Sequence, residues 1–384
     1  MSSLFAFDDA TCRSLAAAHG TPCFAYSGSA ATAQFSALRA VLPPRVRVAY
    51  AVKANPHPDL LACFAALGAS FDCASIGELE RVEALSLPPG RTFFAGPGKR
   101  EAELGKALAM GVRVQAEGFE DLARLDALVD RETAVNLRVH PAFDIDEGHR
   151  IIGGSGPSAF GVDEEEVPVL LARAAALRHV RIRGLHVFAA SNQRDASKLL
   201  AIHGAVLALA KRLSEAHDLV FEQIDLGGGL GIPYAAEQAP LDLAALGRGH
   251  AELLTQHPWF KGELILEPGR FLAGPCGTYL ARVLRIKESR GTRFAILEGG
   301  INHLLRPLLT GEPFPVKAVG KGEGTVPYTL AGPLCTSLDR LGDVRLPELA
   351  AGDLLAFGST GAYGLNEGMT HFLSHPVPPE VWVG

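Results

Sequence analysis

Eight short apolar runs, each followed by a stretch with helical periodicity, constrain the fold of this 384-residue chain more than any other feature. Continuous apolar runs are typical of strands that are buried on both faces. We predict a (β/α)8 barrel, because eight such units over about 225 residues match its count and size. A doubly wound open sheet is the alternative, since strand order cannot be read from one sequence. The candidate strands are 46–53, 70–75, 92–97, 112–117, 135–140, 182–189, 221–228 and 264–269.

The pattern changes after residue 271. Helical periodicity gives way to short β-rich runs separated by turns with glycine or proline, which predicts a second, mainly antiparallel β domain. A β-rich run at 23–27 is expected to join that domain as an N-terminal strand. We therefore expect an N-terminal segment over 1–27 that packs with the β domain, the barrel over 28–271 and the β domain over 272–384.

Composition excludes several classes of protein. Lys and Arg total 36 against 42 Asp and Glu, a net charge of −6, so the chain lacks the basic surface of a nucleic-acid binder. No apolar run approaches the length of about 18 residues that indicates a membrane span. The 6 cysteines form no CxxC pair and the 13 histidines no HExxH motif, so we predict no metal site. We expect a cytoplasmic protein with reduced thiols.

Reactive side chains stand where the predicted strands end, on the face of such barrels that carries active sites. Lys53 ends the first predicted strand and is either a solvated strand end or a partly desolvated amine suited to Schiff-base chemistry. Asp72 ends the second strand, where an ordinary helix cap is the simpler interpretation. Glu267 and Arg270 end the eighth strand. They form either a surface ion pair or a site in which the acid partners a pyridoxal ring nitrogen.

A glycine run, Gly227 to Gly229, follows the seventh strand. Glycines let backbone N–H groups approach an anion, and loops after strands seven and eight are the usual phosphate site of these barrels. A structural turn is the alternative. The run is not a dinucleotide-binding fingerprint, because Ile232 stands where that motif needs glycine.

Taken together, these motifs resemble the pyridoxal-phosphate decarboxylases with an alanine-racemase-type barrel, the family of diaminopimelate, ornithine and arginine decarboxylases. The resemblance extends over nearly the whole chain. Within the family it is strongest to the carrier-protein-linked glutamate decarboxylase of aminoglycoside biosynthesis and similar enzymes of specialised gene clusters. The matching segments, in order, are YAVKANP, FDCASIGEL, GPGK, RGLHV, IDLGGGLGIPY, LEPGRFL, GINHLLRP, GPLCTSLD, GAYG and HPVPPEVWV.

The resemblance implies that pyridoxal phosphate is the cofactor and gives each matching residue a role. Lys53 would carry the cofactor as a Schiff base, and Glu267 would keep the ring nitrogen protonated, so that the ring accepts electrons when CO2 leaves. Cys335 would protonate the resulting carbanion, reaching in from the other subunit of a homodimer. The other cofactor-binding residues would surround the ring and phosphate: Asp72, Arg138, Ser191, Gly227, Gly228, Gly229, Gly269, Arg270 and Tyr363.

Several positions depart from the family pattern. Phe188 stands where the family usually stacks an imidazole on the cofactor ring. Thr336 replaces the acid that follows the cysteine and grips a distal amine, and Thr310 replaces a tyrosine four residues after Arg306. In the SKFG element, Ala159 replaces the lysine. The expected substrate contacts are Arg270, Arg306, Thr310, Thr336 and Tyr363.

Loss of the acid predicts a substrate without a free distal ammonium, because a site built to bind such a group discriminates strongly against substrates that lack it, and the converse should hold. The predicted reaction is α-decarboxylation of an amino acid or derivative, free or attached to a carrier protein, in a specialised pathway. Arg306 would receive a carboxylate or phosphate of the substrate, or form an ordinary ion pair. The alternative is meso-diaminopimelate decarboxylation in lysine biosynthesis.

The sequence disfavours two other functions and leaves a third open. A racemase is disfavoured by the GPLC and EPGR segments. A non-catalytic, single-barrel pyridoxal-phosphate binder is disfavoured by the β domain. An inactive homologue stays open because of Phe188 and Thr336.

Overall fold

The computed structural model describes residues 4–143, 156–188 and 190–384. Residues 1–3 of the expected N-terminal segment, and Ala189 at the end of candidate strand 182–189, lie outside this part. The chain divides into two compact units. The larger comprises Phe35–Gly231 and Leu241–Gly269; the smaller comprises Met1–Gln34, Ile232–Pro240 and Arg270–Gly384. The boundaries at 27 and 271 stay predictions.

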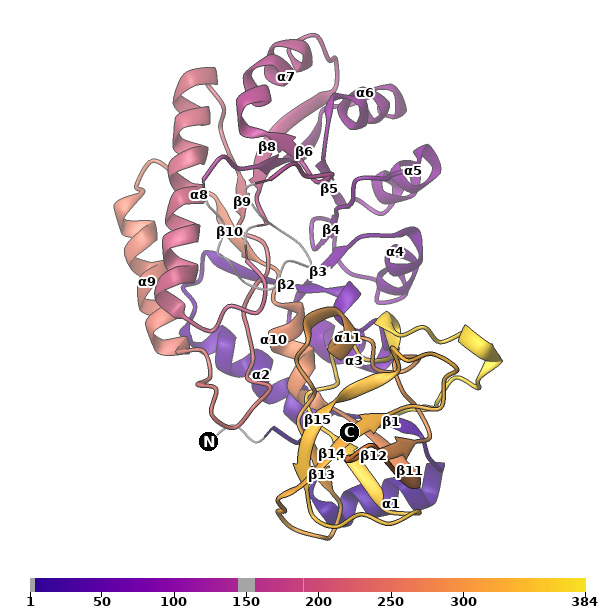
Figure 1. Cartoon of the computed structure of the whole chain (residues 1–384). Coiled ribbons are helices and arrows are strands. Elements are labelled where there is room, and N and C mark those ends of the chain that lie inside the picture. Colours follow the sequence, from indigo (N-terminus) through magenta and orange to yellow (C-terminus); the bar gives the residue numbers. More distant parts are fainter. Residues whose placement is uncertain (1–3, 144–155, 189) are drawn as a thin grey trace. The chain divides into compact units, whose positions relative to one another are not determined.

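The larger unit contains a closed ring of eight parallel strands, which confirms the predicted (β/α)8 barrel (Figure 1). The strands pair in the order β5-β4-β3-β2-β10-β9-β8-β6, and a β5–β6 pairing closes the ring. The short β7 (Val162–Asp163) pairs in parallel with the end of β6. The barrel strands are β2 (Val46–Ala51), β3 (Ser70–Cys73), β4 (Thr92–Phe94), β5 (Arg113–Ala116), β6 (Thr133–His140), β8 (Val180–His186), β9 (Gln223–Asp225) and β10 (Glu263–Leu266).

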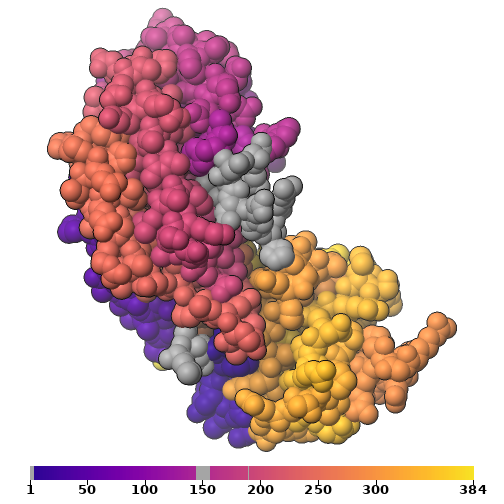
Figure 2. Space-filling view, turned by 60° about the vertical axis from the view of Figure 1, so that its left-hand side comes forward, coloured from indigo at the N-terminus to yellow at the C-terminus, as the bar shows by residue number. Residues whose placement is uncertain are grey.

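Helices follow the barrel strands and start at residues suited to capping. Ser75 accepts a hydrogen bond from the Glu78 N–H at the start of α4, and Asp242 does the same for Ala245 at the start of α9. Helices α8 and α9 lie side by side on the outside of the barrel (Figure 2). The helices are α3 (Pro58–Ala66), α4 (Ile76–Glu83), α5 (Glu101–Ala109), α6 (Phe119–Leu128), α7 (Val167–Ala174), α8 (Ala196–His217) and α9 (Leu243–Gln256).

The smaller unit contains a mainly antiparallel sheet, as predicted, ordered β13-β16-β11-β12-β14-β15. The predicted N-terminal strand β1 joins it, pairing antiparallel with β11 and parallel with β17. The strands are β1 (Cys23–Ser27), β11 (Gly277–Ser289), β12 (Thr292–Leu297), β13 (Val316–Ala318), β14 (Val326–Ala331), β15 (Arg340–Leu346), β16 (Leu354–Phe357) and β17 (Glu380–Val383). The remaining helices are α1 (Asp9–His19), α2 (Gly28–Val41), α10 (Gly269–Ala273) and α11 (Arg306–Thr310).

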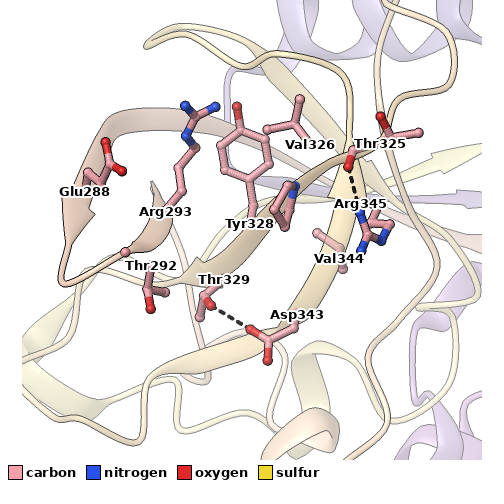
Figure 3. A pocket seen from close by; sticks show the side chains of 12 residues that line it. Glu288, Thr292, Arg293, Thr325, Val326, Tyr328, Thr329, Asp343, Val344 and Arg345 are labelled. Atoms are coloured by element: carbon pink, nitrogen blue, oxygen red, sulfur yellow. Dashed lines mark hydrogen bonds between the residues drawn. The ribbon is translucent and has the colours of Figure 1, made fainter.

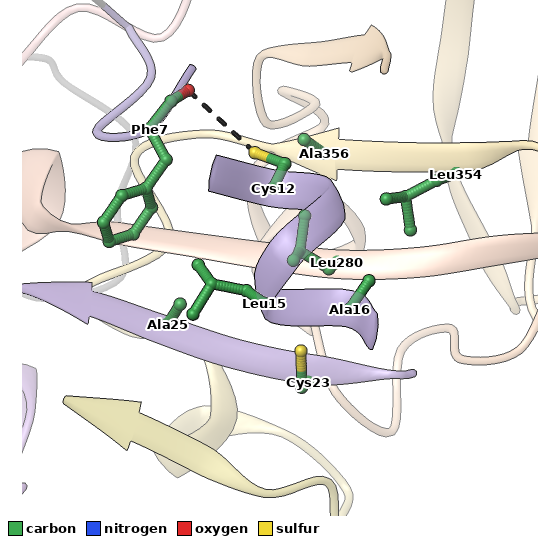
Figure 4. Close-up of a cluster of buried hydrophobic side chains, with 9 residues drawn as sticks. All are labelled: Phe7, Cys12, Leu15, Ala16, Cys23, Ala25, Leu280, Leu354 and Ala356. Atoms are coloured by element: carbon green, nitrogen blue, oxygen red, sulfur yellow. Dashed lines mark hydrogen bonds between the residues drawn. The ribbon is translucent and has the colours of Figure 1, made fainter. Parts of the chain in front are cut away.

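Helix α1 packs its apolar side onto the β sheet (Figure 4). Cys12 and Leu15 of the helix are buried against β1, β11 and β16, to which Leu280 and Leu354 belong. Burying a large apolar side chain contributes about 1.5–3 kcal/mol to folding. The N-terminal segment is thus part of the hydrophobic core of the smaller unit. Within the described ranges, no helix combines the length and apolar character needed to cross a membrane.

A groove of about 840 Å³ lies on strands β12, β14 and β15 of the smaller unit (Figure 3). The Arg293 guanidinium lies over the Tyr328 ring, 5.7 Å from its centre, and Thr329 donates a hydrogen bond to Asp343 at 2.6 Å. None of the residues predicted to form the active site lines this groove. The candidate site therefore has to be built from the strand ends.

Candidate active site

Lys53 lies in a 3₁₀ turn, Val52–Ala54, directly after β2, and not in the strand itself. Its Nζ is 3.0 Å from Oδ2 of Asp72, because the pairing of β2 with β3 sets Asp72 beside Ala51. The side chain of Lys53 is 31% exposed, whereas that of Asp72 is 2% exposed. A buried carboxylate thus holds a primary amine that solutes can still reach.

Two buried carboxyl groups stand at the ends of neighbouring strands. Asp225 ends β9, Glu267 follows β10, and Gln115 Nε2 donates to both, at 3.0 Å to Asp225 and 3.3 Å to Glu267. Burial raises the pKa of Asp225 to about 7. Burial, and next the charge of Asp225, raise the pKa of Glu267 as well. Two carboxyl groups this close ionise together only beside a cation, so the pair provides a site for one positive charge.

His186 adjoins this carboxyl pair, with Nε2 3.7 Å from Glu267 Oε2. Burial, and next the charge of Arg138, lower its pKa, so the imidazole is neutral. Among the described residues, neither of its ring nitrogens has a hydrogen-bond partner, and the same holds for Asp72 Oδ1. The ligand atoms of His186, Asp225 and Glu267 lie within 4.8 Å of one another, close enough for a metal ion. The protonated ring nitrogen of pyridoxal phosphate would also supply the positive charge that the carboxyl pair requires. The polar substituents of its ring could pair with the partnerless atoms of His186 and Asp72.

The loop Gly227–Gly229 after β9 has no space for side chains. A Cβ on Gly228 would lie 2.6 Å from the Glu267 carbonyl oxygen, and one on Gly229 2.6 Å from Cβ of Ala190. A Cβ on Gly227 would also contact Phe188, whose ring therefore borders this loop. The backbone packs close to the strand ends, as expected where N–H groups are to face a phosphate.

Arg138 of β6 is already engaged within the barrel. Its Nη1 is 3.0 Å from Glu117 Oε1, and its guanidinium lies 4.8 Å from the centre of the Phe160 ring. Glu117 also accepts hydrogen bonds from the N–H groups of Gly96 and Gly161. Arg138 therefore anchors the strand ends, and its role toward the cofactor stays a prediction.

The smaller unit gathers the other predicted residues in two places. Arg270 Nη1 donates to the Tyr234 hydroxyl at 2.7 Å, and its guanidinium lies 4.6 Å from the centre of the Tyr363 ring. The guanidinium of Arg306 also lies over the Tyr234 ring, 3.6 Å from its centre. Arg270, Tyr363 and Arg306 thus belong to one cluster organised by Tyr234.

Cys335 and Thr336 lie in the turn between β14 and β15. Cys335 is exposed, and the Thr336 hydroxyl accepts a hydrogen bond from the Leu338 N–H at 3.2 Å. Buried Asp339 ties this turn to the segment after β12 by accepting hydrogen bonds from the N–H groups of Leu334 and Ile301, each at 2.8 Å. The turn is therefore well held, and it carries no acid next to the thiol.

Sequence reasoning missed several members of these clusters: Gln115, Glu117, His186, Asp225 and Tyr234. Asp225 stands two residues before the glycine run and His186 two residues before Phe188, so both carried a signal. Gln115 carried none, because it is one polar residue inside an apolar run.

A closed (β/α)8 barrel with an amine, a buried acid pair and a glycine cradle at its C-terminal strand ends, joined to a β domain, defines an alanine-racemase-type barrel enzyme. Residues 29–274 match the family described as pyridoxal-dependent decarboxylase, pyridoxal binding domain. L-glutamyl-[BtrI acyl-carrier protein] decarboxylase of Niallia circulans is 30% identical over 97% of this chain and 91% of its own. Diaminopimelate decarboxylase of Neisseria meningitidis is 36% identical over 91% of this chain and 85% of its own.

The fold agrees. The crystal structure of Helicobacter pylori diaminopimelate decarboxylase with L-lysine superposes with a TM-score of 0.88 at 27% identity, over 97% of this chain and 94% of that one. The chain therefore belongs to the pyridoxal-dependent decarboxylase family: it is an amino-acid decarboxylase, and pyridoxal phosphate is its cofactor.

Proposed function

We propose that this enzyme removes the α-carboxylate of an amino acid or derivative without a free distal ammonium, in a specialised biosynthetic pathway. A glutamyl group attached to a carrier protein is the leading substrate, and meso-diaminopimelate is the alternative. Relatives that act on each are similar to this chain to comparable degrees, so the choice depends on residues. The single observation that supports the glutamyl substrate is the residue after Cys335. Thr336 is uncharged and its hydroxyl is hydrogen-bonded to the backbone, so it provides no negative charge for a distal ammonium.

The barrel residues of the candidate site each have a part in the proposed reaction. When bound, pyridoxal phosphate supplies an aldehyde for amines and an electron-withdrawing ring. The Lys53 amine would hold the cofactor and later exchange with the substrate amine, and Asp72 would orient it. The Glu267 carboxylate would accept a hydrogen bond from the ring N–H and so keep that nitrogen cationic. Asp225 and Gln115 would hold this carboxylate in place. Phe188 would cover one face of the ring without offering a proton.

The substrate proposal predicts poor turnover of meso-diaminopimelate, ornithine and lysine compared with a glutamyl substrate whose far end is not an ammonium. Loss of a hydrogen bond to a charged group costs about 1.5–3 kcal/mol, or roughly ten- to a hundredfold in kcat/KM. Thr336→Glu should recover part of that factor for the diamino acids. The measurement is steady-state kinetics on this panel, with Ser337→Glu as a matched control that adds the same charge one residue away. Preference for meso-diaminopimelate by the unmodified enzyme would favour the alternative substrate.

We further propose a homodimer in which Cys335 of one subunit completes the site of the other. Cys335 is exposed on the single chain, as a residue that serves a neighbouring subunit must be. The proposed location is the cytoplasm, because the cysteines of this chain are free and free cysteines persist there as thiols.

Mixed dimers of Lys53→Ala and Cys335→Ala subunits should regain activity. Random exchange gives half heterodimers, each with one intact site, and hence about a quarter of wild-type activity. Each variant mixed with itself is the control. Proven subunit exchange without recovery would show that Lys53 and Cys335 do not act across a dimer.

A further inference from the structure

Arg306 is a buried cation that already has an internal counter-ion. Its side chain is 3% exposed, Nη2 lies 2.6 Å from Glu312 Oε2, and Nη1 donates to the Glu312 carbonyl oxygen at 3.1 Å. One residue thus engages both terminal nitrogens of the guanidinium, one through its side chain and one through its backbone. A buried arginine requires such compensation, because an unpaired buried charge is costly.

The turn that brings Glu312 back to Arg306 is built by Thr310. Helix α11 ends at Thr310, and Gly311 follows with φ of 72°, a left-handed conformation that favours glycine. The Thr310 hydroxyl donates to the Arg306 carbonyl oxygen at 3.0 Å and accepts from the Glu312 N–H at 3.2 Å. The residue expected to contact substrate therefore fixes the backbone of the acid that neutralises Arg306.

This ion pair is linked through Tyr234 to Arg270, one of the residues expected to bind the cofactor. The Tyr234 ring contacts the Arg306 guanidinium and its hydroxyl accepts from Arg270. A second acid, Glu367, is close enough to both arginines for their charges to act on it; burial nevertheless raises its pKa. Within this cluster the charge of Arg306 is balanced by Glu312, the acid that is hydrogen-bonded to it.

We propose that Glu312 is a specificity-determining residue that occupies Arg306 permanently, so that the far end of the substrate is an uncharged acyl group such as an amide or thioester. This inference rests on the proposed function and makes its substrate class narrower. It replaces the expectation that Arg306 receives a substrate carboxylate or phosphate, since both terminal nitrogens are engaged. The third guanidinium nitrogen, Nε, has no hydrogen-bond partner in the described part of the chain, and its single N–H suits a neutral carbonyl oxygen.

The kinetic test compares holoenzyme with glutamate, whose far end is anionic, and with γ-glutamyl ethylamide, whose far end is neutral. Wild type should prefer the amide. Glu312→Gln keeps the side-chain shape but frees the guanidinium charge, so kcat/KM for glutamate should rise roughly ten- to a hundredfold, the value of a charged hydrogen bond. Thr310→Val should give a smaller change in the same direction because it loosens the turn. Glu348→Gln, which removes the acid of the exposed pair with Arg293, is the matched control and should change neither ratio.

A binding test needs no turnover. Glutarate at millimolar concentration should raise the melting temperature of Glu312→Gln holoenzyme but not of wild type, and the gain should vanish when Arg306→Gln is added. Wild-type preference for glutamate, or an unchanged ratio in a folded Glu312→Gln enzyme, would overturn the inference. If wild type decarboxylated neither compound nor any carrier-linked glutamyl substrate, the proposed function would fail, and glutarate binding alone would then decide the role of Glu312.

Discussion

Replacing Lys53 by alanine should reduce decarboxylation by at least about 10²-fold, because the amine that would hold the cofactor and exchange with the substrate amine is lost. The alanine variant removes both the nucleophile and the partner of Asp72. Lys53→Arg separates these two losses, because a guanidinium retains the ion pair but is not a nucleophile at neutral pH. We expect both variants to be inactive, which initial rates of CO2 release would measure. An alanine variant within a few-fold of wild type would show that another amine does this work.

The second large effect is expected for Glu267→Gln. A buried amide leaves the ring nitrogen without an anionic partner, and loss of one well-placed electrostatic contact typically lowers kcat by about 10²–10³-fold. Glu267→Asp retains the charge at a shorter reach and should keep more of the rate. Cofactor content, read from its absorbance, separates weak binding from slow chemistry. Glu267→Gln enzyme with full cofactor occupancy and wild-type kcat would contradict the assignment of Glu267.

The barrel could be predicted because strands buried on both faces leave an unmistakable apolar pattern. The same topology brings the C-terminal ends of parallel strands together, so position made Lys53, Asp72 and Glu267 candidates, while the family resemblance supplied their roles. Lys53 itself lies in a 3₁₀ turn beyond the strand, a shift of a few residues that does not move it from the rim.

The polar layer inside the barrel could not be predicted. Gln115, His186 and Asp225 are single polar residues in or at the ends of apolar runs, and their importance comes from meeting across strands distant in sequence. An ion pair was one of the two expectations for Arg306, but its pairing with Glu312 was missed for a different reason. It depends on the left-handed Gly311 and on the two hydrogen bonds of Thr310, which only the folded turn reveals.

The most direct test of the account locates the cofactor on the chain. Borohydride reduction of the purified holoenzyme, followed by protease digestion and mass spectrometry, should find the pyridoxyl group on the peptide that contains Lys53. The chain provides its own control in Lys99, which is 1% exposed and paired with Asp121 at 2.9 Å, and which should stay unlabelled. Label on Lys99 or another lysine, with Lys53 unmodified, would contradict the account.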